Sequence, residues 1–281
     1  MFSELQKFSS KRVMIISAPN GARRTTANHP TLPITPEQLA AAAGELLEQQ
    51  VSVLHLHVRD ENQKHTLDVE SYRSAISAIR TRVGERLIIQ PTTEAVGLYK
   101  AEEQMAVVKA LRPEAVSLSL REICPDEAAE VVAAEFFHWL VKENIWPQFI
   151  LYTPDDLIRF DEMRKKGVFG LENPFSLFVL GHYENNKAGK RSDLDAFLEA
   201  VDCAGFPWAV CCFGSKENDA MLAATGLGGH VRIGFENNLC MADGCIAKNN
   251  AELIAQYTSS SEVLGRKPAS AGEIREAFGL G

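Results

Sequence analysis

Two histidines separated by one residue, His55 and His57, end an apolar and β-branched run that begins at Val51. Alternate side chains of a strand point to the same side, so both imidazoles can reach one cation from the end of that strand. Arg59 and Asp60 follow directly, as is typical where a buried strand meets solvent. The spacing indicates half of a metal site. The alternative is two histidines satisfied by ordinary hydrogen bonds, because so short a motif recurs by chance.

Glu236 is the expected third ligand. It follows a second strand-like run, residues 231–235, far along the chain. If the chain closes a barrel, its last strand lies beside its first, and the Glu236 carboxylate can reach His55 and His57. Two neutral imidazoles and one carboxylate leave positions open for water or substrate, which is typical of catalytic metal sites. Zinc is the leading candidate, and Fe(II), Mn(II) or Co(II) would accept the same ligands.

The elements that must position these residues are strand-like runs that alternate with amphipathic stretches. The predicted strands are 13–18, 51–58, 87–90, 115–120, 149–152, 177–180, 209–213 and 231–235. The clearest predicted helix is 35–50, with Thr35 as N-cap, Pro36 at the first helical position and Gln38 available for a capping box.

This alternation predicts an α/β fold, a (β/α)8 TIM barrel formed by a single domain over residues 1–281. One extra C-terminal helix is expected from Ser270 to Leu280, and residues 183–191 are expected to form a loop over the barrel mouth. An open doubly wound sheet is disfavoured, because no G-x-G-x-x-G loop follows the first predicted strand.

Composition restricts the partners. The chain has 281 residues, of which 46% are hydrophobic, and a formal net charge of -8, which disfavours nucleic acid as a partner. Neither a leader sequence nor an apolar run long enough for a membrane span is present, so we expect a cytoplasmic protein without a membrane partner. The six cysteines form no C-x-x-C pair and are expected to be buried free thiols.

Several stretches spread through the chain resemble the β-keto acid cleavage enzymes. They include L-P-I-T-P-E-Q at 32–38, V-L-H-L-H-V-R at 53–59, G-G-H-V-R-I-G-F-E-N at 228–237 and N-N-A-E-L at 249–253. The resemblance implies a zinc-bearing TIM barrel, usually a homo-oligomer such as a dimer or tetramer. Such enzymes convert a β-keto acid and acetyl-CoA into acetoacetate and a new acyl-CoA.

The resemblance also implies roles for individual residues. The metal ligands fall on His55, His57 and Glu236. The arginine that stabilises developing negative charge falls on Arg232, whose alternative role is an ion pair that only orients Glu236. Small polar positions that hold the carboxylate of the keto acid fall near three hydroxyl residues, Thr92, Ser117 and Ser119. A divalent cation bound by the keto oxygen and the carboxylate would ease removal of the α-proton.

Three positions that are acidic in the best-known member of the family, which acts on an amino-bearing keto acid, are not acidic in this chain. They are occupied by Arg23, Asn237 and Ile150. Arg23, helped by Arg24, therefore predicts a β-keto acid with a distal carboxylate or another anionic or neutral polar tail, because guanidinium pairs well with carboxylate. The alternative is a surface arginine pair that caps the loop.

The general base is the least determined part of the site. Asn237 stands at a catalytic position where a carboxylate is expected, so Glu94 is our candidate base, with Asp60 and Glu122 as further candidates. Each of these carboxylates could instead be an outer partner of a histidine ligand, and a metal-bound hydroxide could also serve.

Two other functions remain open on the sequence. The first is a metal-dependent barrel hydrolase, although such enzymes carry H-x-H on the first strand rather than the second. The second is a binding protein that retains the metal but has lost the base and does not catalyse a reaction.

Overall fold

Eight parallel strands form the centre of the molecule. Their bounds are β2 (Ile15–Ser17), β3 (Val53–Leu56), β6 (Ile88–Pro91), β7 (Ala115–Ser119), β8 (Trp146–Leu151), β9 (Phe175–His182), β11 (Trp208–Cys212) and β12 (His230–Ile233). The computed structural model describes residues 4–182, 187–203 and 206–280. Neighbouring strands follow the order β6-β3-β2-β12-β11-β9-β8-β7, and a parallel bridge between Thr92 and Ser117 joins the two ends. The predicted TIM barrel is therefore confirmed.

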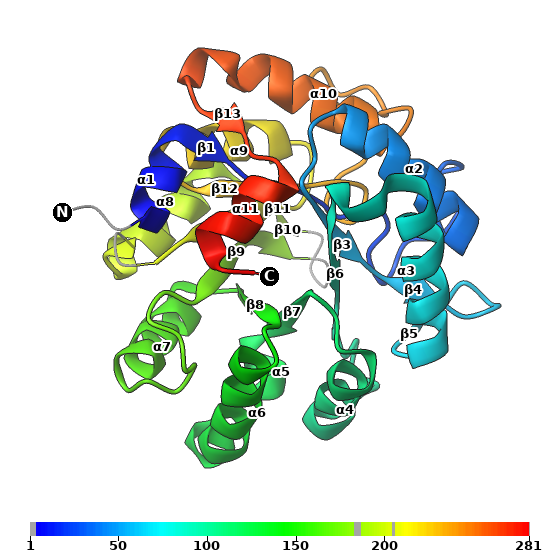
Figure 1. Cartoon of the computed structure of the whole chain (residues 1–281). Helices are drawn as coiled ribbons and strands as arrows, with labels where there is room; N and C mark the ends of the chain where they lie inside the picture. Colours follow the sequence, from blue (N-terminus) through cyan, green and yellow to red (C-terminus); the bar gives the residue numbers. More distant parts are fainter. Residues whose placement is uncertain (1–3, 183–186, 204–205, 281) are drawn as a thin grey trace.

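Helices surround this barrel on the outside (Figure 1). The longer ones are α2 (Pro36–Glu48), α3 (Val69–Val83), α4 (Ala101–Leu111), α6 (Glu130–Lys142), α7 (Pro154–Lys165), α8 (Arg191–Ala200), α9 (Glu217–Gly226) and α10 (Asn250–Ser261). Shorter turns are η1 (Gly84–Arg86), α5 (Leu120–Ile123), η2 (Glu127–Ala129) and η4 (Glu262–Leu264). The terminal helices are α1 (Glu4–Lys11) and α11 (Ala271–Phe278).

Within the described residues, three short strand pairings add to the barrel ladder. They are β1 (Arg12–Val13) with β13 (Lys267–Pro268), β4 (Val58–Arg59) with β5 (His65–Thr66), and β10 (Lys187–Ala188) with the end of β9. The predicted loop at 183–191 is described only in part, because residues 183–186 lie outside the described residues. Its remainder forms β10 and the start of α8.

Local sequence signals set the element boundaries. In α2, Gln38 N donates to Thr35 Oγ1 over 3.3 Å and Thr35 N donates to Gln38 Oε1 over 3.1 Å, which is the predicted capping box. The last strand ends at Ile233, two residues earlier than predicted. The chain turns at Gly234, where a Cβ would lie only 2.4 Å from Ala18 O, so only glycine fits.

Side chains alternate between two buried layers. Met14, Val53 and Leu177 point into the barrel, whereas Leu54 and Val116 pack between the strands and the helices. This period of two is what a closed parallel barrel requires, because both faces of each strand are covered.

The amino end of the barrel is sealed by α11, which crosses the middle of the ring of strands in Figure 1. Ile274 is fully buried there, and the ring of Phe278 lies 4.6 Å from Trp146 and 6.1 Å from Phe8 of α1, between centroids. The helix expected from Ser270 to Leu280 is confirmed, with Ser270 as its N-cap. Apolar side chains thus cover this end of the barrel interior, whereas the predicted site residues lie at the other end.

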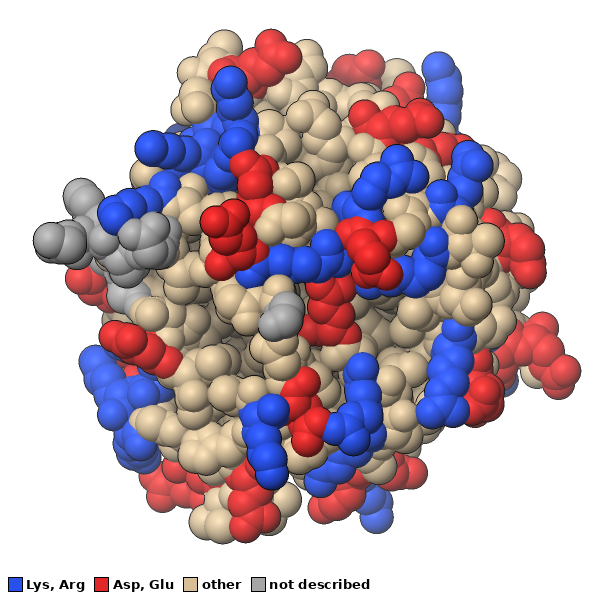
Figure 2. Space-filling model, in the orientation of Figure 1, with Lys and Arg blue, Asp and Glu red and all other residues tan. Residues whose placement is uncertain are grey.

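The surface carries both signs of charge. On the face seen in Figure 2, Lys and Arg side chains alternate with Asp and Glu side chains, without a continuous basic patch. Within the described residues, no helix is long and apolar enough to cross a bilayer. All six cysteines are free, as predicted, and four of them are buried, but Cys240 is only partly buried and Cys245 is exposed, so the prediction of burial was wrong for these two. Both lie in the irregular segment before α10 rather than in a core strand.

Candidate metal and active site

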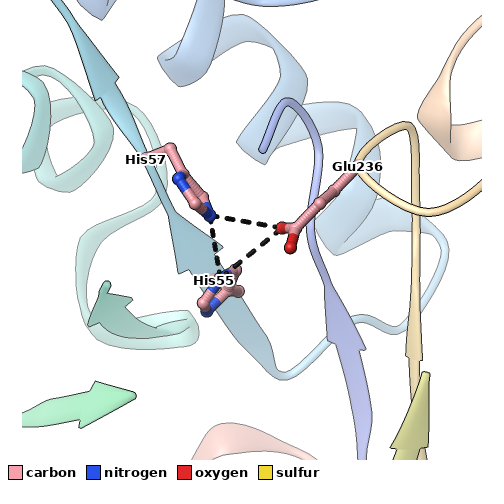
Figure 3. Close-up of side chains that lie close together, drawn as sticks. All are labelled: His55, His57 and Glu236. Carbon is pink, nitrogen blue, oxygen red and sulfur yellow. Dashed lines mark hydrogen bonds and ion pairs between the residues drawn. The ribbon is translucent and has the colours of Figure 1, made fainter. Parts of the chain in front are cut away.

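The side chains of His55, His57 and Glu236 converge at the carboxyl end of the barrel (Figure 3). The two Nε2 atoms are 3.1 Å apart, and Glu236 Oε2 lies 3.5 Å from His55 Nε2 and 3.3 Å from His57 Nε2. Ligand atoms about 2.1 Å from a tetrahedral zinc ion are about 3.4 Å from one another. The three donors are buried, and their separations fit one divalent cation.

Two glycines allow Glu236 to reach the histidines. The turn at Gly234 ends β12 and redirects the chain toward β2, so that Glu236 N donates to Ala18 O over 3.1 Å. Gly21, with a φ of 63°, packs against the carboxylate side chain, and a Cβ on it would lie 2.6 Å from Glu236 Cγ. Arg232 and Glu236 are therefore brought together by a turn, and not by the alternation of a single strand.

Asn250 connects the loop after β2 to the loop after β12 through two hydrogen bonds. Its Nδ2 donates to Pro19 O over 3.0 Å, and its Oδ1 accepts the N–H of Phe235 over 2.8 Å. This buried side chain thus joins the loop after β2 to the loop after β12. It belongs to the N-N-A-E-L stretch, for which no specific role was predicted.

Gln90 orients the imidazole of His55. His55 Nδ1 lies 3.1 Å from Gln90 Oε1, and the two residues are direct neighbours in the β3–β6 register. The amide oxygen can only accept, so the His55 proton resides on Nδ1 and the lone pair on Nε2 faces the other ligands. Burial lowers the pKa of His55 to about 3, which keeps the ring neutral, as a metal ligand must be.

The carboxylate of Glu236 is held in its charged form. Burial acts to raise its pKa, but Arg232 and the two imidazoles outweigh that effect, and the pKa lies well below its usual range. Arg232 donates from NH2 to Glu236 Oε1 over 3.0 Å and to Cys211 Sγ over 3.3 Å. Its Nε and NH1 have no hydrogen-bond partner among the described residues, and the side chain lines the cavity above.

A cavity of about 360 Å³ opens over this cluster. Five residues predicted to act on substrate or proton contribute to its wall, namely Arg23, Thr92, Glu94, Ser119 and Glu122. Arg232 and two residues of the cluster, His55 and Glu236, line it as well. Ser117 and Asn237 are fully or almost fully buried and do not belong to the wall. Tyr152 and His182 also line it, although neither was a candidate site residue from the sequence.

Two carboxylates line the cavity above the cluster. Glu94 Oε2 lies 3.9 Å from His57 Nε2, and burial raises the pKa of Glu94. Burial also raises the pKa of Glu122 to about 7, while its Oε2 accepts the N–H of Ala95 over 3.0 Å. Asp60, the third candidate base, instead accepts two backbone N–H groups of its own turn and does not line the cavity.

Comparisons with known proteins find relatives along nearly the whole chain. The chain is 30% identical over 276 residues to the 3-keto-5-aminohexanoate cleavage enzyme of Fusobacterium nucleatum, covering 96% of this chain and 98% of that one. It is 23% identical to the 3-oxoadipate:acetyl-CoA acetyltransferase of Cupriavidus necator, covering 95% and 94%. The ternary complex of ObcA with C4-CoA adduct and oxalate shares the fold, with a TM-score of 0.71 and 16% identity over 89% of this chain and 68% of that chain.

The family assignment follows from the sequence match along the barrel. Residues 12–280 match the family model of the beta-keto acid cleavage enzymes. That range includes every barrel strand and all residues of the metal cluster. The predicted resemblance is confirmed: this chain belongs to the β-keto acid cleavage enzyme family and is a transferase.

Proposed function

We propose that this protein is a metal-dependent enzyme that condenses a β-keto acid with acetyl-CoA and releases acetoacetate and a new acyl-CoA. The observation that carries the proposal is the convergence of His55, His57 and Glu236 at the base of a cavity, in a chain of this family. Two imidazole nitrogens and one carboxylate favour zinc, and Fe(II), Mn(II) and Co(II) are the other ions to test.

The residues around the cluster suit the removal of an α-proton. A divalent cation held by the three ligands would supply Lewis-acid polarisation of the β-keto oxygen and its carboxylate. Arg232 keeps a fixed positive charge at the same wall, so that its Nε and NH1 can stabilise the negative charge that develops. Glu94, whose pKa is raised by burial, is the base that we propose accepts the proton.

Two groups of polar residues have different roles in this proposal. The hydroxyls of Thr92 and Ser119 line the cavity and would donate hydrogen bonds to the carboxylate of the keto acid. Ser117 and Asn237 lie behind the wall, so we propose that they support the residues in front of them rather than contact substrate.

The substrate tail is expected to be anionic or neutral and polar. Arg23 lines the cavity together with Glu94 and Glu122, and its charge partly offsets the burial that raises the pKa of both carboxylates. An ammonium tail would have to displace or oppose this guanidinium, whereas a carboxylate tail can pair with it. A relative whose name specifies 3-oxoadipate, a dicarboxylic keto acid, is consistent with such a preference.

A coupled assay tests the proposal. Purified protein is incubated with acetyl-CoA and a panel that contains 3-keto-5-aminohexanoate, 3-oxoadipate and a neutral β-keto acid, and acetoacetate is measured. We expect turnover of 3-oxoadipate or the neutral acid that stops after chelation and returns with zinc. Faster turnover of 3-keto-5-aminohexanoate would contradict the proposed tail preference but not the proposed condensation.

Two outcomes would instead support the other functions. A protein that binds zinc and keto acid but exchanges no α-protons with deuterated water would be a binding protein. Hydrolysis of an ester or lactam without CoA would indicate a hydrolase. Both results would contradict the proposed condensation.

We also propose that the chain forms a homo-oligomer, either a dimer or a tetramer. Large apolar side chains remain exposed on the single chain, including Val131 and Val132 on α6 and Val263 near α10. Burial of such side chains between copies would be favourable. Light scattering during size-exclusion chromatography should give a mass of two or four times 31.0 kDa, and a monomer would contradict this proposal.

A further inference from the structure

Arg59 closes the V-L-H-L-H-V-R stretch, but it is neither a donor of the metal cluster nor part of the cavity wall. Its side chain is buried, with 8% exposure, and its guanidinium donates to backbone oxygens. The bonds run from Nε to Gly21 O over 3.1 Å, from NH1 to Gln63 O over 2.8 Å, and from NH2 to Arg24 O over 2.9 Å and Asn20 O over 3.4 Å.

Three of these four carbonyls belong to one loop, residues 20–24 after β2, and that loop contacts both arms of the metal cluster. Asn20 Nδ2 donates to the backbone oxygen of His57 over 3.1 Å. Gly21 packs directly against the side chain of Glu236. Arg24 donates to the backbone oxygen of Phe235, the residue before that ligand. The loop therefore lies between Arg59 and the segment that carries the third ligand.

We propose that Arg59 is a positioning residue for the metal site. By holding the loop 20–24, it sets the surface on which Glu236 rests and the backbone from which His57 projects. The role rests on the proposed metal site and extends it to a residue that contacts neither ion nor substrate. One guanidinium thus links the ligands of the second barrel strand to the ligand that follows the last.

The chemistry of the side chain explains why arginine is needed there. A guanidinium presents five N–H donors in a rigid plane, so it can serve several carbonyls in different directions. A lysine ammonium is compact and has only three donors on a flexible stem. Arg59→Lys keeps the charge but cannot span four carbonyl oxygens, so the loop would lose part of its support.

The chain contains a matched control in Arg266. Its side chain also has 8% exposure, and it donates to the backbone oxygens of Thr225, Gly229 and Arg12 over 2.8, 2.6 and 2.7 Å. These contacts lie at the amino end of the barrel, beside the start of β12. Arg266→Lys should therefore disturb folding in a similar way without reaching the metal ligands.

Zinc affinity is the decisive measurement. It is determined for wild type, Arg59→Lys and Arg266→Lys by competition with a chromophoric chelator, together with the absorption spectrum of each Co(II)-loaded protein and the Tm of each metal-free protein. We expect Arg59→Lys to lose about tenfold or more in zinc affinity and to change the Co(II) spectrum. Arg266→Lys should lower the Tm but keep wild-type affinity and spectrum.

Two results would overturn the positioning role. One is an Arg59→Lys protein with wild-type affinity and spectrum, and the other is an equal loss of affinity in Arg266→Lys. If Arg59→Lys does not fold, Gly21→Ala tests the same support, because its methyl group would push against Glu236. Wild-type zinc affinity in Gly21→Ala would also overturn the idea. Failure of the wild-type protein to bind any divalent ion would instead refute the proposed function itself.

Discussion

Two buried histidines at opposite ends of the barrel have similar pKa values and different surroundings. Burial lowers the pKa of both His55, at the carboxyl end, and His230, at the amino end, to about 3. The ring of His230 is satisfied within the protein, since its Nδ1 accepts the N–H of Met14 over 3.0 Å and its Nε2 lies 3.3 Å from Ser9 Oγ. His55 Nε2 instead lies 3.1 Å from His57 Nε2 and 3.5 Å from Glu236 Oε2, so that three possible ligand atoms converge as a shared cation would require.

The comparison teaches that burial and a depressed pKa do not identify a metal ligand. What separates the two ends is whether the donor atoms converge on one another or are already paired. The neighbourhoods follow the same division, because aromatic rings of Trp146, Phe175 and Phe278 surround the amino end. Arg232 and Glu236 occupy the interior at the carboxyl end. The same strands therefore carry packing residues at the amino end of the barrel and the candidate site residues at the carboxyl end.

Replacing one histidine at each end tests this division most strongly. His57→Ala removes a proposed ligand, so the purified variant should no longer contain one zinc ion per chain. Its zinc affinity should fall by more than the roughly 100-fold that is lost when a residue hydrogen-bonded to a ligand is replaced. His230→Ala should keep the metal and lose about 1–3 kcal/mol of stability, because Met14 N loses its acceptor. Elemental analysis and thermal unfolding distinguish the two. Loss of zinc from His230→Ala would break the comparison.

The same contrast applies to the buried arginines at the two ends. Arg232→Met should lower kcat by about 10²–10³, because it removes a donor aimed at developing charge. Arg266→Met should leave kcat unchanged and lower the Tm, since Arg266 serves only the amino end. Steady-state kinetics with the best keto acid from the panel provides the measurement. An equal loss of kcat in both variants would argue that Arg232 acts through stability.

Variants of Gln90 test whether its hydrogen bond orients the ring of His55. Gln90→Met removes the acceptor of His55 Nδ1 and should weaken zinc binding by about 10–100-fold. Gln90→Glu keeps an acceptor and should retain most of the affinity. Chelator competition measures both, and wild-type affinity in Gln90→Met would mean that the hydrogen bond does not orient the ring.

The smallest expected effect lies in the helix that seals the amino end. Ile274→Val removes one methyl group from a fully buried position and should cost about 0.5–1.5 kcal/mol of the free energy of unfolding. Zinc affinity should not change. Denaturant unfolding together with chelator competition checks both statements, and a change in affinity would show that the two ends are coupled.

The elements and the convergence of His55, His57 and Glu236 could be predicted because each carries a local signal. Thr35 and Gln38 mark a helix start by their own hydrogen bonds. The spacing of His55 and His57 determines which way they point, once the run is known to be a strand. Glu236 required only the additional assumption that the barrel closes.

The supporting contacts could not be predicted, because they depend on register and close approach between distant segments. Gln90 meets His55 only through the alignment of two strands. Arg59 and Asn250 act on backbone oxygens, which leave no pattern in a single sequence. Whether Ser117 lies in the cavity wall or behind it depends on the position of its strand along the barrel axis. The apolar pattern does not specify that position, and Ser117 is buried behind the wall.

The packing of α1 against α11 has a practical consequence for studying the protein. Both helices lie at the sealed end, where Phe8 touches Phe278. A purification tag or surface anchor attached through either helix would therefore project away from the cavity. Molecules tethered in this way would expose the cavity at the carboxyl end of the barrel to the surrounding solution. Metal ions or a thioester could then be delivered by flow to an oriented layer of protein.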